Sequence, residues 1–440
     1  MCYLPEGIVE FMQVQKSIAA IILVAVIVVA GVGVYFFTSA SGDDKTNAAN
    51  TDFVGQEIVP VDNLDNGIVA IGQDSFRWMT YFGLADKCVM VDMNDMSNYL
   101  GKSFMYVGRA QVDIEGGDSA TLTNSDPARK YFTHTNGGIT SDDVRTIIEL
   151  KPSIMIVPIG VYEKHPNEMK AIDNAGINTL AIGEIYTFLD SKTFAITNNL
   201  EKQIDILSKA LGQEKRGNEL KAAFEEIVND IKSISGKVTE KRTAFVGSVS
   251  YSGPHDISTS LAYYLPFELA NVTNILSGSA DYTGSGVKEY SASDIKNGIK
   301  EDTILFVDAS GYSVNSNNNA QGIIKMFEGH EAYLIAPYIW TGINYESVFI
   351  DAYQILRYAY GDSVITEDQM DEKINHVYDL FFGTHESNRN ISEFTKFSSP
   401  LPEKGTSIFN DMSEFYKDAK GNPIRGEISI DSNGKMSVTE

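Results

Sequence analysis

Short apolar runs alternate with helical patterns along the central part of the chain. Gly67–Gly72 and Cys88–Asp92 are apolar runs of strand length, and Ser75–Gly83 between them has a helical pattern. Further strands are predicted at Ile154–Pro158, Asn178–Ile182, Thr243–Gly247 and Thr303–Asp308. Apolar strands that alternate with helices are typical of a mostly parallel sheet, so the pattern predicts an α/β fold.

One long helical segment divides this alternating pattern into two halves. The helical pattern runs from Ser191 to Ser235 with a break at Leu211–Gln213. Its second part, Glu214–Ile234, would be about 30 Å long at about 1.5 Å per residue. Other helices are predicted from Thr140 or Ser141 to Leu150 and at Ser258–Leu265, Asp294–Ile299, Tyr345–Tyr360 and Glu367–Phe382. Two Rossmann-like lobes with central, mostly parallel sheets, joined by one long α-helix, are the simplest account.

The N-terminal region contains an uncharged apolar segment, Ser17–Thr38. Its length of about 22 residues is enough to span a bilayer, whereas the apolar part of a cleaved signal is usually about 7 to 15 residues long. Lys16 precedes the segment, and the acidic Asp43 and Asp44 follow it, which indicates an N-terminus inside and a body outside. We expect an uncleaved, single-pass anchor in the cell membrane, and a cleaved signal is the alternative.

The sequence therefore predicts seven consecutive parts. The segment after the anchor is rich in Asp, Asn, Thr and Ala without periodicity, and the segment from Ser387 to Glu440 is polar and poorly patterned, so we expect a flexible stalk and disorder at the extreme C-terminus. The parts are a cytoplasmic N-terminus (1–16), a transmembrane anchor (17–38), a stalk (39–65), an N-terminal lobe (66–190), hinge helices (191–236), a C-terminal lobe (237–383) and a C-terminal extension (384–440).

Charge and composition exclude several classes of function. With 59 acidic and 35 basic residues the formal net charge is −24, which makes nucleic acid a poor partner. The two cysteines, Cys2 and Cys88, cannot supply a disulfide framework or a thiolate zinc site. The six histidines lack metal-ligand spacing, and no P-loop, GxGxxG or Ser-His-Asp signature is present. We expect no enzyme activity, no catalytic residues, no resident metal and no cofactor.

Five stretches, in the same order along the chain, carry a resemblance to a known family. They are Ile68–Asp92, Val144–Val157, Asn198–Leu220, Ser293–Asp308 and Leu334–Asp362, where an aromatic-rich turn is followed by Asn344 and a helix ending in tyrosine. From about Asn66 to Gly383 the chain resembles the helical-hinge (class III) periplasmic binding proteins of ABC importers, of the iron-siderophore and cobalamin type and closest to archaeal versions. The resemblance implies a monomer that works with an ABC permease and its ATPase.

Candidate ligand-binding residues follow from the position of the strands. Ligands of open parallel sheets bind beyond the carboxyl ends of the strands, so the turns after the strands should line a cleft between the lobes. Arg77 beside aromatic rings suits an anionic or planar chelate, although Asp74 or Ser75 as a helix cap and Trp78 as a core residue are an equal alternative. The candidates are Ser75, Phe76, Arg77, Trp78, Tyr162, Tyr251, His255, Tyr312, Trp340, Asn344 and Tyr345.

The resemblance also implies docking on a permease through one acidic residue on each lobe. Asp294 stands at the matching position of the second lobe. In the first lobe the matching position is Arg145, and Asp143 or Asp142 lies a few residues earlier. The alternative is that these aspartates only complement a helix dipole, which is worth about 0.3 to 1 kcal/mol.

Together these observations predict a substrate-binding protein that captures an iron chelate of the siderophore type outside the membrane and delivers it to a permease. Binding of cobalamin or haem by the same mechanism is one alternative. A membrane-anchored surface sensor or adhesion module without transport is another.

Overall fold

The computed structural model describes residues 50–84, 87–92, 131–135, 137–249, 255–278, 286–340, 342–382 and 425–439. The predicted anchor at 17–38 lies outside these residues. Within the described ranges, no helix combines the length and the apolar character needed to cross a membrane. The chain divides into the units Met1–Ala48 and Ala49–Glu440, and all described residues belong to the second unit.

The N-terminal lobe contains a five-stranded parallel sheet in the order β3-β2-β1-β4-β5. Its central strands β1 and β4 are fully buried, as their continuous apolar sequences predict. The strands are β1 (Ile68–Ala70), β2 (Cys88–Val91), β3 (Tyr131–Phe132), β4 (Ile154–Pro158) and β5 (Thr179–Ile182), and the helices are α2 (Ser75–Tyr81), α4 (Ser141–Leu150), α5 (Ile159–Lys164) and α6 (Pro166–Asn174).

The C-terminal lobe contains a six-stranded sheet in the order β15-β14-β11-β10-β6-β8. Strands β8, β6, β10 and β11 are parallel, whereas β14 and β15 are antiparallel. The strands are β6 (Thr243–Gly247), β8 (Thr273–Asn274), β10 (Ile304–Asp308), β11 (Ala332–Ile335), β14 (Gly426–Ile430) and β15 (Met436–Thr439). The helices are α9 (Leu265–Leu269), α10 (Ala292–Gly298) and α11 (Asn318–Ile324), with short 3-10 turns at Tyr312–Val314, Lys325–Phe327 and Gly361–Ser363. Small two-stranded pairs join β7 (Thr259–Ser260) to β9 (Lys288–Glu289) and β12 (Ile339–Trp340) to β13 (Gly342–Ile343).

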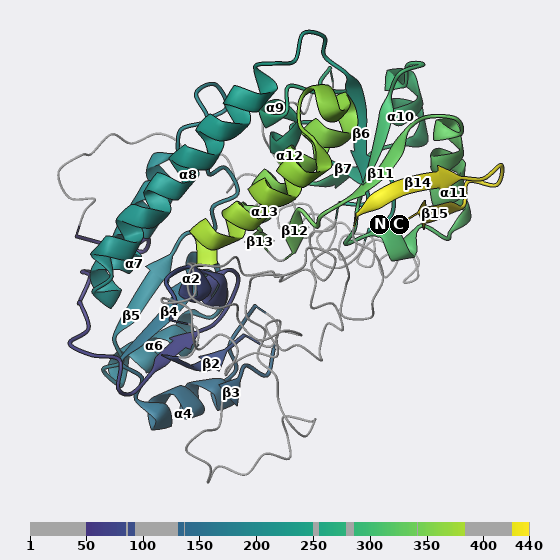
Figure 1. The fold of residues 1–440 in the computed structure, drawn as a ribbon. Helices are drawn as coiled ribbons and strands as arrows, with labels where there is room; N and C mark the ends of the chain where they lie inside the picture. Colours follow the sequence, from purple (N-terminus) through teal and green to yellow (C-terminus); the bar gives the residue numbers. More distant parts are fainter. Residues whose placement is uncertain are drawn as a thin grey trace, which may run out of the picture. The chain divides into compact units, whose positions relative to one another are not determined.

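Two helices connect the two lobes, and two further helices of the second lobe pack against them. Helix α7 (Asn198–Leu211) ends at Gly212, whose φ of 64° is a left-handed conformation that favours glycine, and the 22-residue helix α8 (Glu214–Ser235) then leads into the second lobe. Helices α12 (Tyr345–Tyr360) and α13 (Glu367–Phe382) pack against α8, as Figure 1 shows. The predicted α/β fold with parallel-rich sheets is confirmed.

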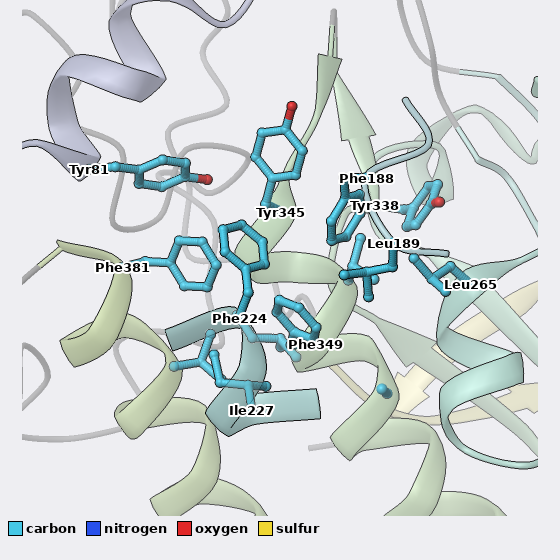
Figure 2. Close-up of a cluster of buried hydrophobic side chains, with 14 of the residues drawn as sticks. Tyr81, Phe188, Leu189, Phe224, Ile227, Leu265, Tyr338, Tyr345, Phe349 and Phe381 are labelled. Atoms are coloured by element: carbon cyan, nitrogen blue, oxygen red, sulfur yellow. The ribbon is translucent and has the colours of Figure 1, made fainter. Parts of the chain in front are cut away.

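Aromatic rings fill the space between these helices and the first lobe (Figure 2). Phe224 of α8 contacts Phe349 of α12 and Phe381 of α13 edge to face, with ring centroids 5.9 and 5.0 Å apart. The ring centroid of Phe188, which follows β5, lies 5.0 Å from the ring centroid of Tyr345. One continuous apolar core therefore extends from the first lobe through the hinge helices into the second.

Four sequence predictions need correction. The helical segment predicted from Ser191 begins only at Asn198, because Ile196 pairs with Leu189 in a β-bridge and Thr197 caps the helix. The predicted helix Ser258–Leu265 is wrong, because this segment contains strand β7 and helix α9 begins only at Leu265, where Pro266 occupies the first turn. The folded body begins before Asn66: Asp52 and Ile58 are buried, and Asp52 accepts hydrogen bonds from the N–H groups of Ala181, Val54 and Gln56. The C-terminal extension ends in the hairpin β14–β15 instead of a disordered tail, because its backbone pairs with the exposed edge of β11.

Candidate ligand-binding site at the junction of the lobes

Helix α2 begins directly beyond the carboxyl end of β1, at the place where a ligand is expected. Asp74 precedes the helix with a φ of 65° and makes no side-chain cap, and Ser75 donates its hydroxyl to the carbonyl of Ile71 at 2.8 Å. Every residue of α2 is buried. The predicted alternative of a capping role for Asp74 or Ser75 is therefore wrong in its geometry, because neither side chain caps the first turn.

Arg77 is completely buried, and its charge is matched by the second lobe. Its guanidinium donates to the carboxylate of Glu346 and to the side-chain oxygen of Asn344, and the Tyr81 hydroxyl donates to the other oxygen of Glu346. Burial alone lowers the pKa of Arg77, but Glu346, Tyr81 and Asp74 outweigh it and raise the pKa above its ordinary value. Burial and Glu346 raise the pKa of Tyr81 as well. The group is thus a charged arginine on a carboxylate, with a neutral phenol beside them.

The aromatic candidates of this region pack against each other. The ring of Trp78 lies 5.5 Å from that of Tyr345 and 5.4 Å from that of Tyr81. The Tyr345 hydroxyl donates to the carbonyl of Ile185 in the first lobe at 3.2 Å. Figure 2 shows Tyr81 and Tyr345 above the aromatic rings of the helices. Trp78 is therefore a core residue, as the alternative interpretation of the sequence predicted.

The structure thus brings together Arg77, Trp78, Asn344 and Tyr345 from two distant parts of the sequence. Each of them is fully buried, as are Ser75 and Phe76. The two terminal guanidinium nitrogens of Arg77 donate to Glu346 and to the side-chain oxygen of Asn344 in the second lobe, and the side-chain nitrogen of Asn344 donates to the carbonyl of Pro337 within that lobe. In this conformation these residues form the contact between the lobes, and ligand binding by them stays a prediction.

The other candidates lie in separate places. Tyr162 is half-buried and donates to Gln56 at 3.4 Å, and burial raises its pKa to about 12. The Tyr312 hydroxyl donates to the carbonyl of Met436, so this side chain fixes the C-terminal hairpin. His255 is partly exposed, and burial lowers its pKa. Tyr251 and the side chain of Trp340 lie outside the described residues.

Sequence reasoning missed several polar side chains at the carboxyl ends of the first sheet. Gln73 donates to the Tyr186 hydroxyl at 2.8 Å, and both side chains are partly exposed. Glu184 follows β5 and is also partly exposed, and burial raises its pKa. All three stand within four residues after a predicted strand, so the rule applied to Arg77 would have found them.

The two candidate docking acids differ in exposure. Asp294 is exposed, and it forms a capping box with Ser291. Asp143 is buried, and it accepts hydrogen bonds from Thr140 and from the backbone and ring of His134. Its burial argues against a docking role for Asp143. Asp142 nearby is exposed, and Arg145 pairs with it at 2.9 Å.

Metal-binding chemistry finds no support in the described part of the chain. No group of three or more His, Cys, Asp or Glu side chains converges there. Cys88 is buried, and its thiol donates to the carbonyl of Leu84 at 3.7 Å within the first lobe.

Neither a protein-family model nor a curated protein sequence matches the chain. Solved structures to which the fold is similar include the molybdate periplasmic binding protein MolA of Haemophilus influenzae, at 15% identity over 76% of this chain and 97% of that chain, with a TM-score of 0.49. The TroA-like periplasmic binding protein FepB from Veillonella parvula is 14% identical over 76% of this chain and 95% of that chain, with a TM-score of 0.45. The periplasmic heme-binding protein RhuT from Roseiflexus sp. RS-1 is 16% identical over 68% of this chain and 98% of that chain, with a TM-score of 0.42. FepB and MolA are described as periplasmic binding proteins and RhuT as a periplasmic heme-binding protein, and MolA is described as the cognate binding protein of an ABC transporter.

Proposed function

We propose that this chain is the substrate-binding component of an ABC importer. The observation that carries the proposal is the arrangement of two α/β lobes on either side of the single 22-residue helix α8. Such a pair of lobes captures a ligand between the carboxyl ends of their strands and needs no covalent chemistry. The ABC permease and its ATPase are the proposed partners, and the chain acts as a monomer.

The proposed cargo is an iron chelate of the siderophore type. The sequence resemblance implies this cargo, and the partly exposed Gln73, Tyr186 and Glu184 offer hydrogen-bond donors and acceptors at the edge where it would bind. Among the described sequence candidates, Tyr162, His255 and Tyr312 stay partly exposed. Cobalamin or haem bound in the same way are the alternatives, since both present a large planar ring and polar edges to such a site.

The apolar segment 17–38 is the proposed single-pass anchor, with the folded body outside the membrane. Asp294 is the proposed docking residue of the second lobe, because its carboxylate is exposed at the start of α10. For the first lobe we propose the exposed Asp142 in preference to the buried Asp143.

A thermal-shift titration of the full chain in detergent tests the proposal. The panel is a set of ferric siderophores, cobalamin, haem and free metal ions. A ligand that binds only the folded state adds about 2.7 kcal/mol at about 100 times its Kd, so one chelate should raise the Tm in a saturable manner. Tyr186→Phe should weaken that shift, whereas Tyr358→Phe, whose ring stacks on Tyr333 within the second lobe, should leave it unchanged. No shift with any chelate would contradict import and favour a surface sensor or adhesion module.

A further inference from the structure

Helix α2 belongs to the first lobe by its position after β1, yet its polar side chains bond to the second lobe. Both carboxylate oxygens of Glu346 are bound by α2, one by Arg77 and the other by the Tyr81 hydroxyl. Arg77 also donates to Asn344, which directly precedes α12. The first turn of α12 and the middle of α2 are thus joined by charged hydrogen bonds that are shielded from water.

A second arginine fixes the other end of α2. Arg216, near the start of the hinge helix α8, donates to the carbonyl of Tyr81 at 2.8 Å. The same guanidinium donates to the carbonyls of Leu380 and Phe381 in α13, at 2.9 and 2.6 Å. These carbonyls stand at the C-terminal ends of α2 and α13, where the helix dipole attracts a cation. Arg216 therefore ties the first lobe, the hinge and the last helix of the second lobe together.

Separating α2 from α12 has a high energetic cost. Removal of one partner from a buried ion pair leaves an uncompensated charge in the interior, which is strongly unfavourable. The side chains of Arg77 and Glu346 are exposed by only 0% and 2%, too little for water to relieve this cost. Movement of one lobe must consequently be passed on to the other at this point, unless water enters.

We propose that Arg77, Tyr81, Arg216, Asn344 and Glu346 form an interlobe clamp that makes α2 and the start of α12 open and close as one unit. The loop 72–74 precedes α2 at the proposed ligand edge. A displacement of this loop would move α2 and, through the clamp, the start of α12 in the second lobe. The clamp concerns the mechanics of the fold and goes beyond the proposed function, because it holds for any cargo or for none.

Hydrogen exchange of the full chain, followed by mass spectrometry without ligand, tests the clamp. Glu346→Gln keeps the shape of the side chain but removes its charge. At temperatures well below the Tm, amides of α2 and of the first turns of α12 should both exchange faster than in the parent, whereas those of α4 should not change. The matched control is Arg357→Met, also on α12, because Arg357 pairs only with Asp362 and Glu367 among its described ion pairs. It should leave α2 unchanged.

Faster exchange confined to α12 in Glu346→Gln, with α2 as slow as in the parent, would overturn the clamp. If Glu346→Gln does not fold, Arg216→Met provides the same test. In this variant the amides of α2 and of the end of α13 should both exchange faster than in the parent. Unchanged exchange of α2 would overturn the clamp. The exchange experiment contains no ligand, so a failed search for cargo does not change its outcome. Likewise, failure of the clamp in this experiment does not decide whether the chain binds a cargo.

Discussion

The two lobes start a corresponding helix with the same motif and put it to different uses. Helix α4 begins with a capping box of Thr140 and Asp143, and helix α10 begins with a capping box of Ser291 and Asp294. In the second lobe the aspartate stays exposed. In the first lobe His134 adds two hydrogen bonds and the carboxylate is buried. One local sequence signal thus yields an accessible charge in one lobe and an internal tie in the other.

A second correspondence concerns the carboxyl ends of the sheets. Asp92 follows β2 and accepts the N–H groups of Gly72 and Gly137 from the neighbouring loops. Asp308 ends β10 and accepts the N–H groups of Ser310 and Tyr338. Each sheet therefore holds the loops at its proposed ligand edge with a buried aspartate. Predictions that separate the lobes follow, from the largest effect to the smallest.

The largest effect is expected from Asp308→Asn, as a change in pH dependence. Burial raises the pKa of Asp308 from 3.8 to about 7, so between these values the folded state holds a proton that the unfolded state has lost. Stability then falls as the pH rises, by up to about 4 kcal/mol at about 1.4 kcal/mol per pH unit. Urea denaturation from about pH 4 to about pH 7 should show a smaller fall in Asp308→Asn than in the parent. Equal slopes would refute this assignment, and the exposed Asp294→Asn serves as the control.

The next effect separates the two capping aspartates. Asp143→Ala should lower the free energy of unfolding by about 3 kcal/mol, because the donors of Thr140 and His134 lose an acceptor that is itself buried. Asp294→Ala should cost only about 1 kcal/mol, as expected for an exposed cap. Urea denaturation at neutral pH measures both. Equal losses would show that burial of Asp143 adds nothing.

Substitution of the capping hydroxyls should lower the free energy of unfolding by the same amount in both lobes. Thr140→Ala and Ser291→Ala each remove one side-chain acceptor from the first turn, and each should cost about 1 kcal/mol. The comparison uses the same urea transitions. If Thr140→Ala lowers the free energy of unfolding several times more than Ser291→Ala, the hydroxyls of the two capping boxes are not equivalent.

The smallest effect is expected from His134→Ala. The His134 side chain is 56% exposed, so the contact of its ring with Asp143 should contribute less than about 1 kcal/mol. Its backbone N–H still donates to Asp143 in the variant. A loss as large as that of Asp143→Ala would show that the imidazole, and not the backbone, holds the aspartate.

Much of the fold could be predicted because the decisive signals are local. Strand β4 and helices α12 and α13 have the predicted bounds, and the break before α8 falls at Gly212 as predicted. The C-terminal hairpin was missed although Asn433-Gly434 between Gly426–Ile430 and Met436–Thr439 is a strong turn signal. The packing of residues 50–61 was missed because it depends on contacts such as Phe53 on Lys202, which no periodicity reveals.

The candidate site was only partly predictable. Position after a strand selected Arg77 and Asn344, and the structure places them together. The hydrogen bond between them was not predictable. Glu346, which completes the group, lies 269 positions after Arg77 in the sequence and belongs to a mostly buried helix. Pairing at such a distance is decided by tertiary packing and leaves no mark in the local sequence.

The most direct test of the account uses Trp78 as a reporter of the junction. The chain has two tryptophans, so Trp340→Phe leaves Trp78 alone, packed between Tyr81 and Tyr345 at the contact of the lobes. Because Trp340 is itself a candidate ligand residue, the unsubstituted chain is titrated in parallel. Its emission is measured while the full chain is titrated with ferric siderophores, cobalamin and haem. We predict a saturable change that corresponds to one ligand per chain for one of these chelates. Emission that stays constant across the whole panel would contradict a ligand-binding protein whose lobes are coupled at this junction.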